Sequence, residues 1–441
     1  MQKRKRLNYE LVIPLLIVLG IGVYFIPPIN ARLAWRLDSA RTRIKYLINP
    51  PEEAVFQPQQ QSQVDVAVTQ MMQVHIAAQN PETTLTPIPV PILKPKITTT
   101  PLPATVMLEG VKYENQHGRL NYCGPANFSM ALSFWGWEGN RDVIGKMVMP
   151  INDKDKNVMP YELQDYITEN VPGMSSVIRN GGDIEVLKRL ISEGFPVVAE
   201  IGIYELDVNG KYGWMGHYAF VTGYDEASKL IIYQDSYQPE GAPAGPNRKI
   251  EYETFIERWR AFNYVFIAVY PVEKQNDVFT LLGPLADEEE ANRHALSVAQ
   301  AEGNSLGGVD QFFAGFNAGT SHVALFQYAD AAIAYDYAFS LYADLDSNDS
   351  IRPYRMMWFQ TGPYKAYFYT NRFADVISLA NTTLNDTISE PVLEESLYWR
   401  GQAYYMAGET NLAIKDYRDA LKVHPKWLPA TQALQDLGLQ P

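Results

Sequence analysis

Apolar residues follow different patterns in different parts of the chain, and the first pattern predicts a membrane anchor. Residues 11–26 form an uncharged apolar run, LVIPLLIVLGIGVYFI, after a basic segment over 1–9. As a helix rising about 1.5 Å per residue, this run is about 24 Å long, somewhat short of the roughly 30 Å hydrocarbon core of a bilayer. No convincing small-residue cleavage site follows it. We therefore expect an uncleaved transmembrane signal anchor over 10–27, with a removed signal peptide as the alternative.

The next segment, 28–104, is predicted to be a juxtamembrane and Pro/Thr/Gln-rich linker. Seven prolines lie between Pro81 and Pro103. Proline at this density excludes a helix or a central strand and favours extended polyproline II. Basic residues on both sides of the apolar run do not decide its orientation. Because a stalk of this kind follows the anchor, we expect the main domains to be extracytoplasmic.

Helix-like and strand-like patterns alternate over residues 105–273, which predicts an α+β domain. Asp183 is suited to cap a helix that Gly194 ends, because the apolar residues between them share one helical face. Four apolar runs rich in β-branched and aromatic residues predict strands, at 195–204, 217–224, 230–234 and 265–270.

The remaining chain is rich in Ala and Tyr at helical spacing. We expect a connector helix and loop over 274–310, and an all-α domain of tetratricopeptide-like helical repeats over 311–441. The best repeat match has small and aromatic residues at the characteristic offsets, namely Gly401, Tyr404, Gly408, Ala413, Tyr417, Ala420 and Pro425. Small residues let two helices approach, and the aromatic rings fill the space beside them. Helical hairpins without a repeat origin are the alternative.

Charge and cysteine content narrow the function classes. The 441-residue chain has a formal net charge of −13, which disfavours a nucleic-acid partner because phosphate backbones are also negative. Its single cysteine, Cys123, excludes an intramolecular disulfide and a thiolate metal cluster. Cys123 is therefore either a buried hydrophobe or a working thiol.

The surroundings of Cys123 favour a working thiol. Pro125 suits the first turn of a helix, and Phe128, Leu132 and Trp135 recur at helical spacing after it. Cys123 therefore lies at or beside a helix N-terminus, where free backbone N–H groups and the helix dipole favour the thiolate.

A cysteine nucleophile needs a base, and location reduces six histidines to two candidates. One lies in the linker and three lie in the helical region, at positions 75, 294, 322 and 424. His117 lies in an expected loop, whereas His217 begins a predicted strand. If the turn of the following hairpin centres on Glu226, His217 and Asp235 are directly opposed and share a face. Asp235 would then orient the imidazole, although it is also suited to a simple turn role.

Amide hydrolysis also requires donors for the developing oxyanion. The Cys123 backbone N–H and the side-chain amide of Gln116 are the natural pair, with Asn115 or Asn121 as alternatives to Gln116.

These residues carry a resemblance to a known family. Gln116, the block NYCGPAN around Cys123, the block GHYAFVTGYD from Gly216 and the block YQDSY around Asp235 resemble the double-glycine (bacteriocin-processing) leader peptidase-like family. The resemblance implies a papain-like cysteine peptidase fold. It also implies Cys123 as nucleophile, His217 as base, Asp235 as its orienting partner and Gln116 as oxyanion donor. Transporter segments, which present leader peptides in the best-known members, do not occur here, so double-glycine specificity is not expected.

The prediction is thus a membrane-anchored cysteine peptidase that hydrolyses peptide bonds without a cofactor or metal. The repeats would recruit a protein or peptide partner. Two alternatives are a cell-wall amidase-endopeptidase and a transglutaminase-like acyltransferase, which use the same order of Cys and His. A third, from a different class, is a catalytically idle papain-fold and repeat scaffold for protein binding.

Overall fold

The computed structural model of the chain describes residues 44, 55–58, 101–117, 119, 121–150, 157–206, 212–237, 245–348, 352–385 and 393–441. The predicted anchor over 10–27 and most of the predicted linker lie outside these residues. Within the described part of the chain, no helix is both long enough and apolar enough to cross a bilayer.

In the part of the chain that the structure describes, seven strands form one antiparallel sheet, in the order β2-β7-β3-β4-β5-β6, with β1 also paired to β4. The strands are β1 Thr105–Met107, β2 Met174–Arg179, β3 Val197–Leu206, β4 Tyr212–Asp225, β5 Leu230–Gln234, β6 Arg248–Glu251 and β7 Phe266–Pro271. The four predicted strands are confirmed as β3, β4, β5 and β7, and β4 begins five residues earlier than the predicted 217.

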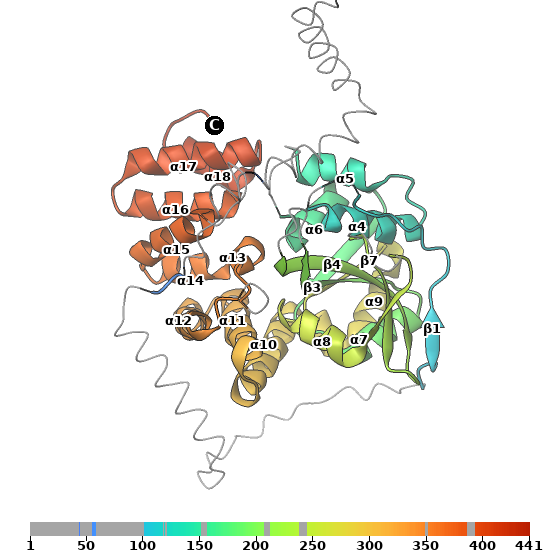
Figure 1. The fold of residues 1–441 in the computed structure, drawn as a ribbon. Coiled ribbons are helices and arrows are strands. Elements are labelled where there is room, and N and C mark those ends of the chain that lie inside the picture. Colours follow the sequence, from blue (N-terminus) through green and yellow to red (C-terminus); the bar gives the residue numbers. More distant parts are fainter. Residues whose placement is uncertain are drawn as a thin grey trace, which may run out of the picture.

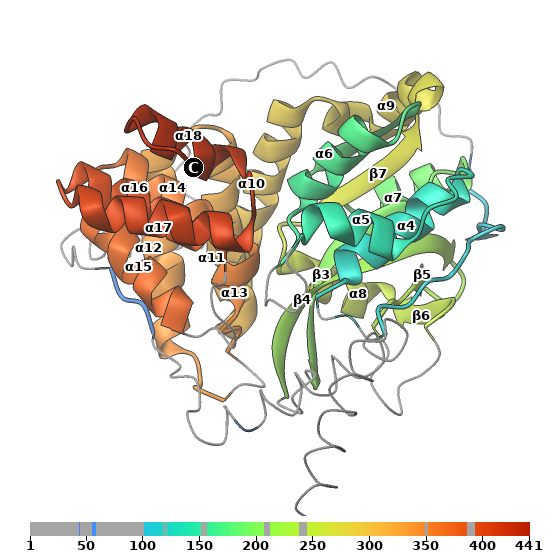
Figure 2. The same cartoon turned by 90° about the horizontal axis from the view of Figure 1, so that it is seen from above.

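Helices cover both faces of the sheet, as Figures 1 and 2 show. One face packs against α4 Cys123–Phe134, α5 Arg141–Val148 and α6 Pro160–Asn170, and the other against α7 Ile184–Ser192, α8 Tyr252–Arg260 and α9 Gln275–Leu282. Alternation along the strands explains both cores: Val198 packs toward α4, whereas its neighbours Val197 and Ala199 pack toward α7. Asp183 caps α7 as predicted, since its carboxylate accepts the Val186 N–H at 2.6 Å.

A helical region follows, and it lies beside the sheet domain (Figure 2). Two short 3-10 turns, Val272–Lys274 and Gly283–Ala286, flank α9. The later helices are α10 Glu288–Ser305, α11 Gly308–Ala324, α12 Tyr328–Asp344, α13 Met356–Phe359, α14 Gly362–Tyr369, α15 Phe373–Asn385, α16 Glu394–Met406, α17 Thr410–Val423 and α18 Leu428–Asp436. The helix crossing requires Gly401, because a Cβ there would lie 2.7 Å from the Tyr417 ring.

The sheet domain and the helical region share a hydrophobic core. Trp214 of β4 stacks on Phe262, with ring centroids 5.7 Å apart, and meets Phe359 of α13 edge-on at the same separation. A Cβ at Gly216 would lie 2.6 Å from the Phe359 ring. The helical region therefore packs directly beside the strand segment that carries His217.

Candidate active site

Cys123 is the first residue of α4, as the sequence predicts, and its side chain is partly exposed. Among the described residues, no side chain caps this helix start at Tyr122, which leaves the first-turn N–H groups suited to bind an anion. Gly124 is tightly enclosed, because a Cβ there would lie 3.3 Å from Tyr218. The glycine lets α4 approach β4 closely enough for the thiol to reach the strand.

Asn127, one turn along α4, ties the thiol-bearing turn to the sheet. Its amide nitrogen donates to the backbone carbonyl of Cys123 at 2.8 Å, to that of Tyr218 at 2.9 Å and to the Ser236 hydroxyl at 3.1 Å. Asn127 is fully buried, so these contacts fix the helix start against β4 and against the segment after β5.

His217 and Asp235 meet as predicted, but through a different strand register. His217 Nε2 lies 2.9 Å from Asp235 Oδ1, and both side chains are buried. The predicted direct opposition is wrong: Phe220 pairs with Gln234, so continuing this register places Asp235 opposite residue 219. The two side chains are diagonal neighbours, and a shift of two residues keeps them on the same face. A bulge between Val221 and Gly223 adds a further offset near the turn.

Asp235 has two further partners that hold its carboxylate. Oδ1 also accepts the Tyr237 N–H at 2.9 Å, and Oδ2 forms an ion pair with Arg248 of β6. Arg248 was not predicted from the sequence, because a long connection separates β6 from β5 and conceals the pairing of Tyr233 with Arg248. Arg248 is thus a positioning residue, since it acts on Asp235 rather than on the thiol.

These contacts set the charge of the pair. Burial alone would lower the pKa of His217, because it opposes a charge on the ring. The charge and hydrogen bond of Asp235 outweigh this effect, with a further contribution from the Cys123 thiol, and raise the pKa of His217 to about 10. Burial would raise the pKa of Asp235, yet the charge and hydrogen bond of His217, then Arg248 and the Tyr237 N–H, hold it below its ordinary value. The favoured state is an imidazolium beside a carboxylate.

Gln116 contacts Ser236, the residue that follows Asp235. Its backbone N–H donates to the Ser236 carbonyl at 2.9 Å, and its side-chain Oε1 accepts the Ser236 hydroxyl at 3.0 Å. With Oε1 used in this way, the amide Nε2 is the end of the side chain suited to donate to an oxyanion. The alternative Asn115 uses its side-chain oxygen to accept the His117 N–H at 2.9 Å.

His117, the other candidate base, is exposed, and its backbone carbonyl accepts Arg141 at 2.9 Å. Sequence reasoning also overlooked Glu200, a buried residue of β3 that is paired with Tyr218. Burial, with the nearby Cys123, raises the pKa of Glu200 well above its ordinary value. A lone Glu within the apolar run FPVVAEIGIY was a signal for a buried acid.

A group of possible metal ligands lies elsewhere in the described residues. Glu162, Glu394 and His424 bring three donor atoms within 4.8 Å of one another. These residues belong to α6, to α16 and to the end of α17, so they form a group separate from Cys123 and His217.

Two parts of the chain match known protein families. Residues 108–267 match the Peptidase_C39 like family. Residues 394–427 match the tetratricopeptide repeat. The two matches confirm the predicted resemblance to a papain-fold peptidase followed by a tetratricopeptide region, and they indicate a peptidase or a binding scaffold. The peptidase-like match includes Cys123, His217 and Asp235.

No curated protein matches the chain. Among solved structures, a protein described as a C39-like peptidase from Bacillus anthracis is 17% identical, with a TM-score of 0.31. The similarity covers 38% of this chain and 98% of that one.

Proposed function

We propose that the protein is a membrane-anchored cysteine peptidase that hydrolyses peptide bonds with Cys123, His217 and Asp235. The observation that supports this most directly is that one imidazole has both a carboxylate and a thiol as neighbours. Its Nε2 contacts the buried Asp235 carboxylate, while the Cys123 thiol at the start of α4 lies within reach of the ring. A purely structural histidine has no need of a partly exposed thiol as its second neighbour.

In this mechanism the Cys123 thiolate attacks the peptide carbonyl and forms a tetrahedral oxyanion. The Cys123 backbone N–H and the Gln116 amide donate hydrogen bonds to that oxyanion. The His217 imidazolium then gives its proton to the leaving amine, which departs as the C–N bond breaks. Water attacks the remaining thioester with His217 as base, and this step releases the acid and restores the thiol.

Asp235 keeps the imidazole oriented throughout these steps, and Arg248 and Tyr237 keep Asp235 in place. The reaction as proposed involves proton transfers and acyl transfer by protein groups alone. The repeats recruit a protein or peptide partner, since stacked helical hairpins present extended concave surfaces. Their contact with β4 at Gly216 brings such a partner near the thiol.

The proposal is tested by mass-spectrometric profiling of a peptide library with the full chain. Wild-type protein should cleave a consistent set of peptides, and Cys123→Ala should abolish that cleavage, because the alanine has no nucleophile. Iodoacetamide should also label Cys123 at pH 6 faster than it labels free cysteine. Cleavage that persists in Cys123→Ala would overturn the mechanism, and an unreactive thiol in a folded, inactive protein would favour the scaffold function.

The proposed anchor over 10–27 has its own test. The full chain should remain with membranes after alkaline carbonate extraction, whereas a chain lacking residues 1–27 should be released. Release of the full chain would refute the anchor and leave the proposed chemistry unaffected.

A further inference from the structure

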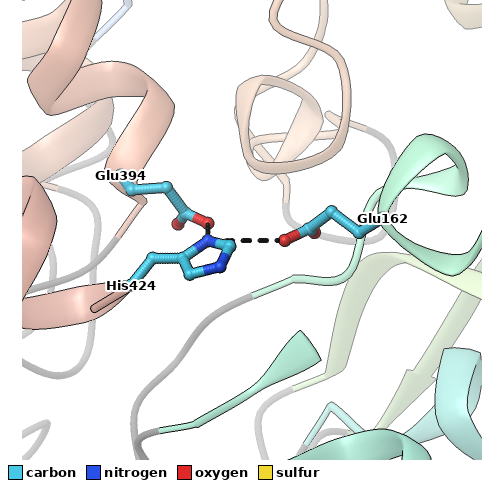
Figure 3. A group of neighbouring side chains, drawn as sticks. All are labelled: Glu162, Glu394 and His424. Carbon is cyan, nitrogen blue, oxygen red and sulfur yellow. Dashed lines mark hydrogen bonds and ion pairs between the residues drawn. The ribbon is translucent and has the colours of Figure 1, made fainter. Parts of the chain in front are cut away.

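Three metal-binding side chains converge where the last helical repeat meets the sheet domain. Figure 3 shows Glu162, Glu394 and His424 pointing toward one another from three elements. The α16–α17 hairpin is antiparallel, so the first turn of α16 and the end of α17 lie at the same end. Glu394 begins α16, and His424 directly follows α17. Glu162 faces them from the first turn of α6.

The His424 ring nitrogen lies close to both carboxylates. Its Nδ1 is hydrogen-bonded to Glu394 Oε1 at 3.2 Å and lies 3.6 Å from Glu162 Oε1, beyond the range of a hydrogen bond. Donors placed about 2.0–2.2 Å from a tetrahedral metal ion are separated from each other by about 3.3–3.6 Å. The two separations from His424 are close to this value, and all three donor atoms lie within 4.8 Å of one another.

Two of the three ligands are also held in place by a second contact. Glu162 and Glu394 are buried, with 6% and 5% exposure. Glu162 Oε2 accepts the Met159 N–H at 2.8 Å, and its Oε1 faces His424. The His424 ring stacks on Trp427, with ring centroids 6.1 Å apart and planes inclined by 19°. Orientation of this kind by outer contacts is characteristic of metal ligands.

An adjacent cavity supplies an independent observation. Glu394, Glu395, Met159 and Trp358 are among its lining residues. Trp358 is 3% exposed, and within the described structure its indole N–H has no hydrogen-bond partner. A buried donor in a residue that lines the cavity calls for an acceptor, such as a water molecule beside Glu394.

We propose that Glu162 Oε1, Glu394 Oε1 and His424 Nδ1 bind a divalent transition-metal ion of the zinc class and thereby join the sheet domain to the last repeat. One imidazole and two carboxylates form a ligand set that suits such an ion. The ion has a structural role at the contact between α6 and the α16–α17 hairpin, and the peptide-bond chemistry proposed for Cys123 does not depend on it.

The test uses the tag-free full chain, stripped with a chelator and titrated with Zn²⁺ and with Co²⁺. We expect one equivalent of Zn²⁺ to bind and to raise the midpoint of thermal unfolding by several degrees. Bound Co²⁺ should give the intense visible absorption of a four-coordinate site. Glu394→Gln and His424→Gln should each weaken binding by about 100-fold or more.

Glu395→Gln is the matched control, because Glu395 lies beside Glu394 and bonds the Tyr161 hydroxyl at 2.7 Å without belonging to the ligand set. This variant should bind the ion as wild type does. Absence of Zn²⁺ binding by the wild-type chain would overturn the proposal whether or not the variants fold. Equal binding by wild type and His424→Gln would also overturn it.

Discussion

Replacing Asp235 by Asn tests the proposed site most sharply, because it keeps an oxygen acceptor for His217 while removing the charge and the ion pair with Arg248. The carboxylate lies 2.9 Å from His217 Nε2 in a buried setting. For charge centres about 4 Å apart and an effective dielectric constant of about 20, the attraction is about 4 kcal/mol. Because about 1.4 kcal/mol corresponds to a factor of ten, kcat/KM for Asp235→Asn should fall by about 10²–10³-fold.

The pH dependence of kcat/KM separates this charge effect from mere damage to the fold. The pKa of His217 is raised to about 10 chiefly by Asp235, against the effect of burial, so the basic limb of the wild-type profile should lie high. In Asp235→Asn it should move down by about two to three pH units. The assay is hydrolysis of the best peptide from the library profile, between pH 5 and pH 11.

Asp330→Asn is the matched control, since Asp330 is exposed on α12. It should leave both kcat/KM and its pH profile unchanged. An Asp235→Asn variant with kcat/KM within about threefold of wild type and an unmoved basic limb would remove Asp235 from the reaction.

Three further predictions follow from the same contacts. Arg248→Gln should lower kcat/KM by about tenfold to a hundredfold, because a hydrogen bond between charged groups contributes about 1.5–3 kcal/mol. Arg248→Lys should recover part of this loss. Equal activity of wild type and both variants would refute the positioning role. The His217–Asp235 pair should stabilise the fold fully between pH about 4 and 6.5. This contribution should be lost as pH rises toward 10, because of the raised pKa of His217, and as pH falls below 3.8, because of the lowered pKa of Asp235. The free energy of urea unfolding should show this pH dependence, and that of His217→Gln should lack it. Gly401→Ala should destabilise the α16–α17 hairpin by about 1–3 kcal/mol, because its Cβ would lie 2.7 Å from Tyr417, whereas Gly307→Ala, with open space around it, should leave the thermal midpoint almost unchanged.

The sequence predicted the parts of the site that depend on local pattern. Cys123 at a helix start follows from Pro125 and the helical spacing after it, and Asp183 as a cap follows from the same logic. The His217–Asp235 contact was predicted with the wrong register, and the prediction survived because a shift of two residues preserves the face. A shift of one residue would have placed the two side chains on opposite faces of the sheet.

The parts that the sequence did not predict depend on contacts between distant elements. Arg248 reaches Asp235 only because β6 adds to the edge of the sheet at β5. His424 was set aside as a residue of the helical region, yet the fold brings it to Glu162, which lies in α6 of the other domain. Neither contact has a characteristic spacing along the chain, because each depends on how elements pack in three dimensions.

The position of α6 connects the repeats to the thiol. Glu162, in the first turn of α6, faces the end of α17, while the neighbouring Val158 carbonyl accepts the Tyr218 hydroxyl at 2.9 Å. Leu163 of the same turn lies 3.4 Å from the position of a Cβ at Gly124, the residue next to Cys123. A displacement of the last repeat that moves α6 therefore also disturbs the packing around Cys123. Close packing leaves few ways to absorb such a shift, so under the proposed function a partner bound to the repeats should change turnover to the extent that it moves this helix.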